Sequence, residues 1–166
     1  MLSEKMLNEL NDQINAEFHS AYLYLAMATY FEDINLRGMA AWMKVQAQEE
    51  MGHAMRFYNY IFDRNAKVEL KLIEGPQTVW DSARAAFEAA YEHEQYITGR
   101  IDKLVDLANQ NNDHATRSFL NWFVDEQVEE EANAYEIVQR LKSVADNKPG
   151  LFILDHELGK RKAGGE

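Results

Sequence analysis

Apolar residues recur at helical spacing along the first part of the chain. A first stripe consists of Leu7, Leu10, Ile14, Phe18, Ala21, Leu25 and Ala28, and a second consists of Met39, Met43, Ala47, Ala54, Phe57 and Ile61. Steps of three and four residues place each stripe on one face of an α-helix. Ser3 precedes the first stripe and can cap its helix. We therefore expect two long helices, the first ending within residues 33–38 and the second within 64–67.

Two further stripes follow a segment that has few helix signals. Residues 67–80 contain an alternating stretch and the breaker Gly75–Pro76, which predicts a long extended crossover. The later stripes consist of Ala83, Phe87, Ala90, Ile97, Ile101, Leu104 and Ala108, and of Phe119, Phe123, Ala134, Ile137 and Leu141, with a polar turn at residues 109–113 between them. A long crossover allows the third helix to run parallel to the second. The pattern predicts an all-α fold, a four-helix bundle with one crossover.

The C-terminal residues predict a short additional element. After Pro149 an amphipathic piece of about residues 150–160 favours a fifth helix, and residues 161–166 are expected to form a disordered tail. The four-helix bundle is expected over about residues 4–145, within a single domain of residues 1–166. The short helix has an apolar face that one bundle cannot bury, so we expect association with further subunits.

Composition and charge narrow the classes of function. Of the 166 residues 46% are hydrophobic and 27% charged, as in ordinary globular proteins, and the net charge is −11. This charge repels nucleic acid and anionic lipid and attracts metal cations. The chain has no cysteine, which excludes disulfides and thiolate metal sites. No stretch predicts a membrane span or a signal peptide, so we expect a cytoplasmic protein without membrane or nucleic-acid partners.

Acidic residues interrupt the apolar stripe of every predicted long helix. These residues are Glu17, Glu50, Glu94, Glu126 and Glu130, and His53 lies one turn after Glu50 on the same face. Burying one unpaired carboxylate costs several kcal/mol, and several together also repel one another. The stripes contain no matching set of lysines or arginines. Several carboxylates with one imidazole are the ligands that suit a pair of divalent metal ions.

Three motifs resemble those of a known family. The segments QAQEEMGH (46–53), YEHEQ (91–95) and DEQVEEE (125–131) resemble the ferroxidase signatures of non-haem bacterial and archaeal ferritins, which belong to the ferritin-like di-iron proteins. The resemblance covers nearly the whole chain, including the crossover and the short C-terminal helix. One departure from the general di-iron pattern is that Gln127 and Glu130 occupy the spacing of a second Glu-x-x-His pair.

The resemblance implies a role for each site residue. Glu17, Glu50 and His53 would hold a first iron, with Glu50 bridging to a second iron held by Glu94 and Glu130. Tyr24 would lie beside the pair, and Gln127 would line it by hydrogen bonding. A third iron site would use Glu49, Glu126 and Glu129, sharing Glu130. The family further implies Fe(II) oxidation by O2 or H2O2 and storage of Fe(III) as mineral inside a cage of 24 subunits.

A few other residues bear on the choice within this family. Met51 stands beside the bridging glutamate, where bacterioferritins bind haem, but we interpret it as a packing residue and expect no haem. Glu92 and His93 are interpreted as surface residues. Arg117 and Leu120 replace the acidic residues of animal ferritins, which argues against iron passing through an acidic three-fold channel.

Other functions of the same fold remain open at this point. A bacterioferritin would bind haem, and a rubrerythrin-like peroxidase would need cysteines that this chain lacks. A radical-generating or hydroxylating di-iron enzyme would need a substrate pocket or partner that the sequence does not identify. A purely structural helical scaffold would require most of the acidic residues in the stripes to lie at the surface.

Overall fold

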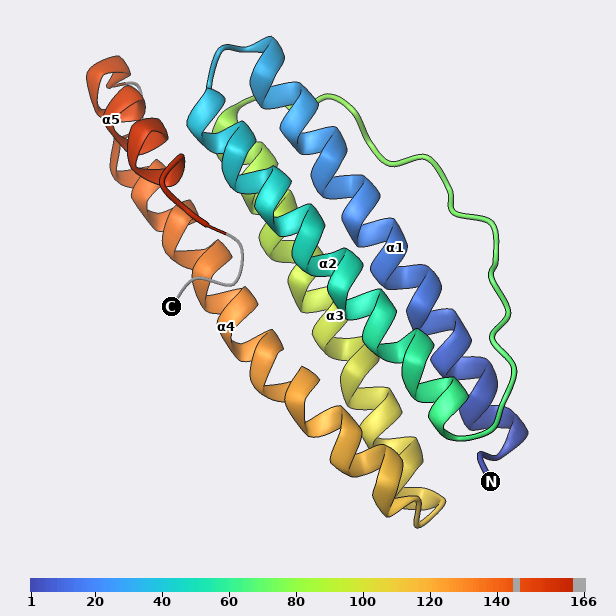
Figure 1. Cartoon of the computed structure of the whole chain (residues 1–166). Helices are drawn as coiled ribbons and strands as arrows, with labels where there is room; N and C mark the ends of the chain where they lie inside the picture. Colours follow the sequence, from blue (N-terminus) through green and yellow to red (C-terminus); the bar gives the residue numbers. More distant parts are fainter. Residues whose placement is uncertain (145–146, 163–166) are drawn as a thin grey trace.

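The computed structural model describes residues 1–144 and 147–162, and its regular elements there are five helices. They are α1 (Glu4–Asp33), α2 (Arg37–Asp63), α3 (Ala83–Gln110), α4 (His114–Val144) and α5 (Lys148–Leu158). The first four form a long bundle, and α5 lies beside one end of it (Figure 1). The crossover from α2 to α3 follows the length of the bundle, so these two helices run parallel (Figure 1). The predicted all-α bundle with a crossover and a short fifth helix is confirmed.

Local signals in the sequence explain where the helices begin. The hydroxyl of Ser3 accepts a hydrogen bond from the Met6 backbone N–H at 3.2 Å, and that of Ser82 caps α3 in the same way. Asn147 caps α5 by accepting from the Gly150 N–H at 3.1 Å, with Pro149 in the first turn. Because of this cap, α5 begins at Lys148, slightly before the predicted start near residue 150.

Three asparagines in the left-handed conformation follow helix ends. Asn35, Asn65 and Asn112 have φ values of 59°, 54° and 51°. Asparagine tolerates this conformation better than most residues, because its short side chain can bond to the local backbone. Two of these residues lie in the tight turns that join α1 to α2 and α3 to α4. The turns fix each pair of helices as an antiparallel hairpin.

Apolar clusters fill the bundle on both sides of its middle. Near the crossover end of α2, Phe57 stacks on Phe123 with ring centroids 4.1 Å apart. Toward α5, Phe87 packs against Phe31 and Trp42. Between these clusters the buried side chains include polar and acidic ones. The bundle therefore isolates a polar centre from solvent at both ends.

The fifth helix is docked on the bundle by specific contacts. Leu154 and Leu158 belong to the apolar cluster that contains Phe87. Asp155 Oδ1 accepts a hydrogen bond from the Met39 backbone N–H at 2.8 Å, so a residue of α5 caps the N-terminus of α2. A Cβ atom added at Gly38 would overlap the Asp155 carbonyl oxygen, so glycine permits this close approach. Phe152 stays exposed on the other face of α5.

None of the helices in residues 1–144 and 147–162 combines the length and apolar character needed to cross a membrane.

We predict that Gly38→Ala destabilises the protein by about 1 to 3 kcal/mol, because the new methyl group must push α5 away from α2. Gly52→Ala is the matched control on the same helix, since nothing lies within 4 Å of the added Cβ. Helix propensity predicts that this control gains up to about 1 kcal/mol. Thermal unfolding followed by circular dichroism measures both, and equal shifts would contradict the close contact.

Candidate metal centre

Four carboxyl groups and one imidazole meet in the middle of the bundle. The five side chains are buried and come from all four long helices: Glu17 of α1, Glu50 and His53 of α2, Glu94 of α3 and Glu130 of α4. Ligand atoms of Glu17, Glu50 and His53 all lie within 4.8 Å of one another. The same holds for His53, Glu126 and Glu130. The structure thus brings together the five residues predicted to hold the two metal ions.

The helical period explains why these acidic residues are buried. Glu17 lies between Ile14 and Ala21 on the buried face of α1, and Glu50 lies between Ala47 and Ala54 on that of α2. A carboxylate at such a position could reach solvent only if its helix moved out of the bundle. His53 follows one turn after Glu50, and its Nδ1 lies 3.3 Å from Glu50 Oε2.

Burial makes the ionised form of each carboxyl group costly. It raises the pKa of Glu17 from 4.5 to about 8, with the nearby charge of Glu50 as the next cause. The pKa values of Glu50, Glu94 and Glu130 are raised in the same way, first by burial and then by a neighbouring carboxylate. Without a metal ion, these groups therefore retain protons at neutral pH.

One oxygen of the centre is left without a partner. Among the described residues, Glu17 Oε2 is buried and accepts no hydrogen bond. Native structures satisfy nearly all buried polar atoms, so an orphaned carboxylate oxygen needs an explanation. A cation bound beside Glu50 and His53 would supply the missing partner. The donor set of carboxylate oxygens and one imidazole nitrogen fits a divalent transition metal such as iron.

Glutamine side chains orient the buried carboxylates. Gln46 Nε2 donates to Glu50 Oε1 at 3.0 Å and to Glu130 Oε2 at 2.7 Å. Gln13 Nε2 donates to Glu17 Oε1 at 2.7 Å. Neither glutamine was predicted from the sequence, although each stands four residues before its glutamate on the same helix face, a spacing that indicates contact.

Gln127 and Tyr24 complete the set around Glu94. Gln127 Nε2 donates to Glu94 Oε2 at 3.1 Å, and the Tyr24 hydroxyl donates to Glu94 Oε1. Burial, and then the Glu94 carboxylate, raise the pKa of Tyr24 well above its usual value. Both residues therefore lie against a predicted metal ligand, in the positions that the resemblance implied.

His93 lies beside Tyr24 and is half-buried, so its interpretation as a surface residue is right only in part. Its ring packs edge-on against Tyr24 at 6.2 Å, and its Nε2 lies 2.7 Å from Ser20 Oγ. Burial, followed by the charge of His19, lowers the pKa of His93 to about 4. In the sequence His93 stands between Glu92 and Glu94, and nothing there indicates its contact with α1.

Arginines hold two of the glutamines from the rim of the centre. Arg100 Nε donates to Gln13 Oε1 at 2.8 Å, and Arg161 Nη1 donates to Gln46 Oε1 at 2.7 Å. Because a guanidinium only donates, each amide must turn its oxygen toward the arginine and its NH2 group toward the carboxylates. Arg161 was expected in a disordered tail, and that expectation is wrong for this residue. Residues 163–166 of the expected tail lie outside the described residues.

The three acidic residues predicted for a third iron site do not form one close group. Glu126 is half-buried, with Oε1 3.7 Å from His53 Nε2, so it lies at the edge of the centre rather than among the core residues. Glu129 is exposed and lies three residues after Glu126 on α4. Glu49 is turned toward Arg161 Nη2, which bonds Glu49 Oε2 at 2.5 Å.

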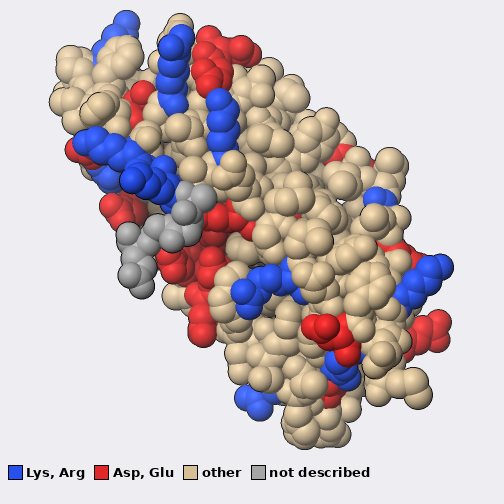
Figure 2. Space-filling model, in the orientation of Figure 1, with Lys and Arg blue, Asp and Glu red and all other residues tan. Residues whose placement is uncertain are grey.

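Acidic side chains gather on the surface over the middle of α4 (Figure 2). Glu126 and Glu129 belong to this part of α4, and Glu126 reaches the centre through His53. Negative charge at such a surface raises the local concentration of cations. The surface beside the centre on the α4 side is therefore acidic.

These features define a carboxylate-rich candidate metal centre inside a four-helix bundle. Residues 7–144 match the Ferritin-like domain, and the chain belongs to this family.

Named relatives and solved structures agree with this membership. The chain is 45% identical to the bacterial non-heme ferritin of Bacteroides fragilis over 161 residues, which cover 97% of this chain and 100% of that protein. It is 40% identical to the one of Staphylococcus aureus, with 97% of each covered. An open pore ferritin from the archaeon Archaeoglobus fulgidus superposes with a TM-score of 0.97 and 51% identity over 98% of this chain and 100% of that one.

We predict that the metal-free protein loses stability as pH rises from about 4.5 to about 8. Over this range the unfolded glutamates ionise while the folded ones, whose pKa values are raised, still hold protons. Folding then binds protons, so each step up in pH disfavours the native state until the folded groups also ionise. Melting temperatures across this range measure the slope.

Glu94→Gln is the matched variant for this prediction, because it removes one raised pKa while its single amide oxygen can still accept the hydrogen bond from Tyr24. Its slope should be shallower than that of the unaltered protein. Identical slopes would contradict the assignment of raised pKa values to the centre.

Proposed function

We propose that this chain is the subunit of an iron-storage ferritin whose bundle centre oxidises Fe(II). The observation that carries the proposal is the set of four buried carboxyl groups with one imidazole and no lysine or arginine among them. Family membership and the named non-heme ferritin relatives support it. Iron is the substrate and the cargo in this proposal.

In the proposed centre, Glu17, Glu50 and His53 bind one Fe(II), and Glu94 and Glu130 bind the other. Glu50 is the bridging ligand, a role supported by its central place, with one oxygen near His53 and the other bonded to the amide shared with Glu130. Binding displaces the protons that these carboxyl groups hold, because a metal ligand must be deprotonated. Affinity for Fe(II) therefore increases with pH.

Two bound Fe(II) ions can give up two electrons together. Dioxygen accepts two electrons and two protons to become hydrogen peroxide, or peroxide accepts them to become water. The glutamine donors hold the carboxylates in place during this step, so little reorganisation is needed as the charge on iron rises. The Fe(III) product then moves to a mineral core within the cage.

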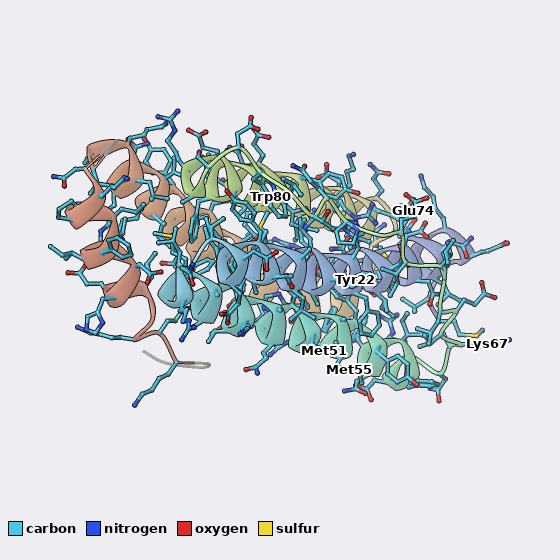
Figure 3. All side chains as sticks on the ribbon, turned by 90° about the horizontal axis from the view of Figure 1, so that it is seen from above. Tyr22, Met51, Met55, Lys67, Glu74 and Trp80 are labelled. Atoms are coloured by element: carbon cyan, nitrogen blue, oxygen red, sulfur yellow. The ribbon has the colours of Figure 1, made fainter. Side chains whose placement is uncertain are left out.

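A hollow homo-oligomer is the second part of the proposal. Tyr22, Met51 and Met55 are partly exposed on the α1–α2 side of the bundle (Figure 3). Leu70, Leu72 and Val79 of the crossover are exposed as well, which adds apolar surface that a partner could cover. Phe152 and Ile153 of α5, which are 60% and 63% exposed, form another. We propose that both are covered in a cage of 24 subunits.

Met51 takes a different place from the one first assigned to it. The residue is 46% exposed, so its own subunit covers only part of it. In the proposed cage it packs against a second copy of the chain, and no haem is required. A Soret band in the purified protein, lost in Met51→Leu, would contradict this part of the proposal.

We predict that Phe152→Asp and Ile153→Asp each shift the protein from a large assembly to smaller species, because a buried carboxylate opposes the contact between subunits. Lys160→Asp, at an exposed position just after α5, is the matched control and should retain the assembly. Size-exclusion chromatography with light scattering measures the mass. A monomer formed by the unaltered protein at micromolar concentration would contradict the cage.

We predict that Glu50→Ala and His53→Ala slow the oxidation of the first two Fe(II) per subunit by at least about 10- to 100-fold, since each removes a ligand of the proposed pair. Glu49→Ala and Glu129→Ala are the matched comparisons on the same helices. They should retain the fast phase and alter the oxidant consumed per iron or the later transfer to the core.

Stopped-flow absorbance after mixing each variant with two Fe(II) per subunit in air separates the two groups. If Glu49→Ala abolishes the fast phase as fully as His53→Ala does, the division between a di-iron pair and a third site is wrong.

A further inference from the structure

Arg161 occupies the α2 edge of the metal centre. Its Nη1 donates to Gln46 Oε1 at 2.7 Å, and its Nη2 donates to Glu49 Oε2 at 2.5 Å. The guanidinium carbon lies 4.3 Å from the centroid of the Trp42 ring, within the range of a cation–π contact. The side chain is 21% exposed. One cation is therefore held by three residues of α2.

The fold builds the path that brings Arg161 to this place. Leu154 and Leu158 anchor α5 in the apolar cluster, and Asp155 caps α2. The chain then turns at Gly159, beside Gly38, and the Arg161 backbone N–H bonds the Leu158 carbonyl at 3.2 Å. The position of Arg161 is therefore set by the docking of α5 on the bundle.

Arg161 is linked to the centre through a single amide. Gln46 accepts from Arg161 and donates to Glu50 and Glu130. A guanidinium cannot lose its proton at ordinary pH, so its charge is permanent. Any further cation that uses Glu49 must share this carboxylate with the charge of Arg161.

We propose that Arg161 is a built-in cation that blocks Glu49 as a metal ligand, so that a third metal ion binds there only after the Arg161 side chain withdraws. The inference rests on the proposed function, because it concerns the site next to the di-iron pair. Arg161 acts here as a positioning residue. It holds Gln46 in the orientation that serves Glu50 and Glu130, and it keeps Glu49 neutralised.

The proposal distinguishes the two sides of the third site. Glu126 and Glu129 of α4 have no ion-pair partner among the described lysines and arginines, whereas Glu49 has Arg161. A metal ion can therefore approach from α4 without displacing a fixed charge. Completing the site with Glu49 requires the displacement.

Zn²⁺ is a suitable probe, because it takes the same ligand types and has no redox chemistry. Isothermal titration of the metal-free assembled protein compares the unaltered chain with Arg161→Gln and with Lys162→Gln, which removes the same charge from the adjacent exposed residue. We expect two tight Zn²⁺ per subunit in the unaltered chain and in Lys162→Gln. Arg161→Gln should bind a further Zn²⁺ about five-fold more tightly than the other two proteins do.

Glu49→Gln combined with Arg161→Gln completes the experiment, and the gain should vanish in this double variant because the freed ligand is absent. Arg161→Gln with an isotherm identical to that of the unaltered chain, while two tight sites remain, would overturn the role of Arg161 alone. A gain that survives Glu49→Gln, or an equal gain in Lys162→Gln, would overturn it as well. Loss of the two tight sites from the unaltered chain would instead refute the proposed metal centre itself.

Discussion

The burial of four carboxyl groups from four helices in the middle of one bundle is the constraint on which the rest of the structure depends. Burial and mutual repulsion raise the pKa values of Glu17, Glu50, Glu94 and Glu130, so the centre must hold either protons or metal ions. Apolar clusters on both sides keep water away from it. In the proposed function, the free energy lost by burying these groups would maintain a site that exchanges protons for metal ions.

The structure orients these carboxylates without neutralising them. An arginine placed directly in the centre would form a lasting ion pair and compete with every incoming metal ion. Instead, Arg100 and Arg161 bond to the amide oxygens of Gln13 and Gln46, and these amides separate the two charges from the carboxylates. Each glutamine passes on a hydrogen bond while carrying no net charge. The carboxylates are held in place and remain free of a direct ion pair with these two arginines.

Helical periodicity was sufficient to predict the bundle and most of the buried acidic residues, because Glu17, Glu50 and Glu94 each interrupt a regular stripe. Glu126 lies at the edge of the stripe on the fourth helix. Helical periodicity alone could not decide whether its side chain is buried in the core or lies at the surface. The position of Arg161 could not be predicted. Its contact with Glu49 spans 112 residues and depends on how α5 docks, which no local pattern encodes.

The two edges of the centre consequently differ in charge. At the α2 edge, Glu49 is paired with the permanent cation of Arg161. At the α4 edge, Glu126 lies partly in solvent and also within reach of His53 and Glu130. A carboxylate in that position can contact an ion while the ion still keeps part of its water shell. In the proposed function, an entering ion would lose its waters in steps, because Glu126, His53 and Glu130 could replace them one at a time.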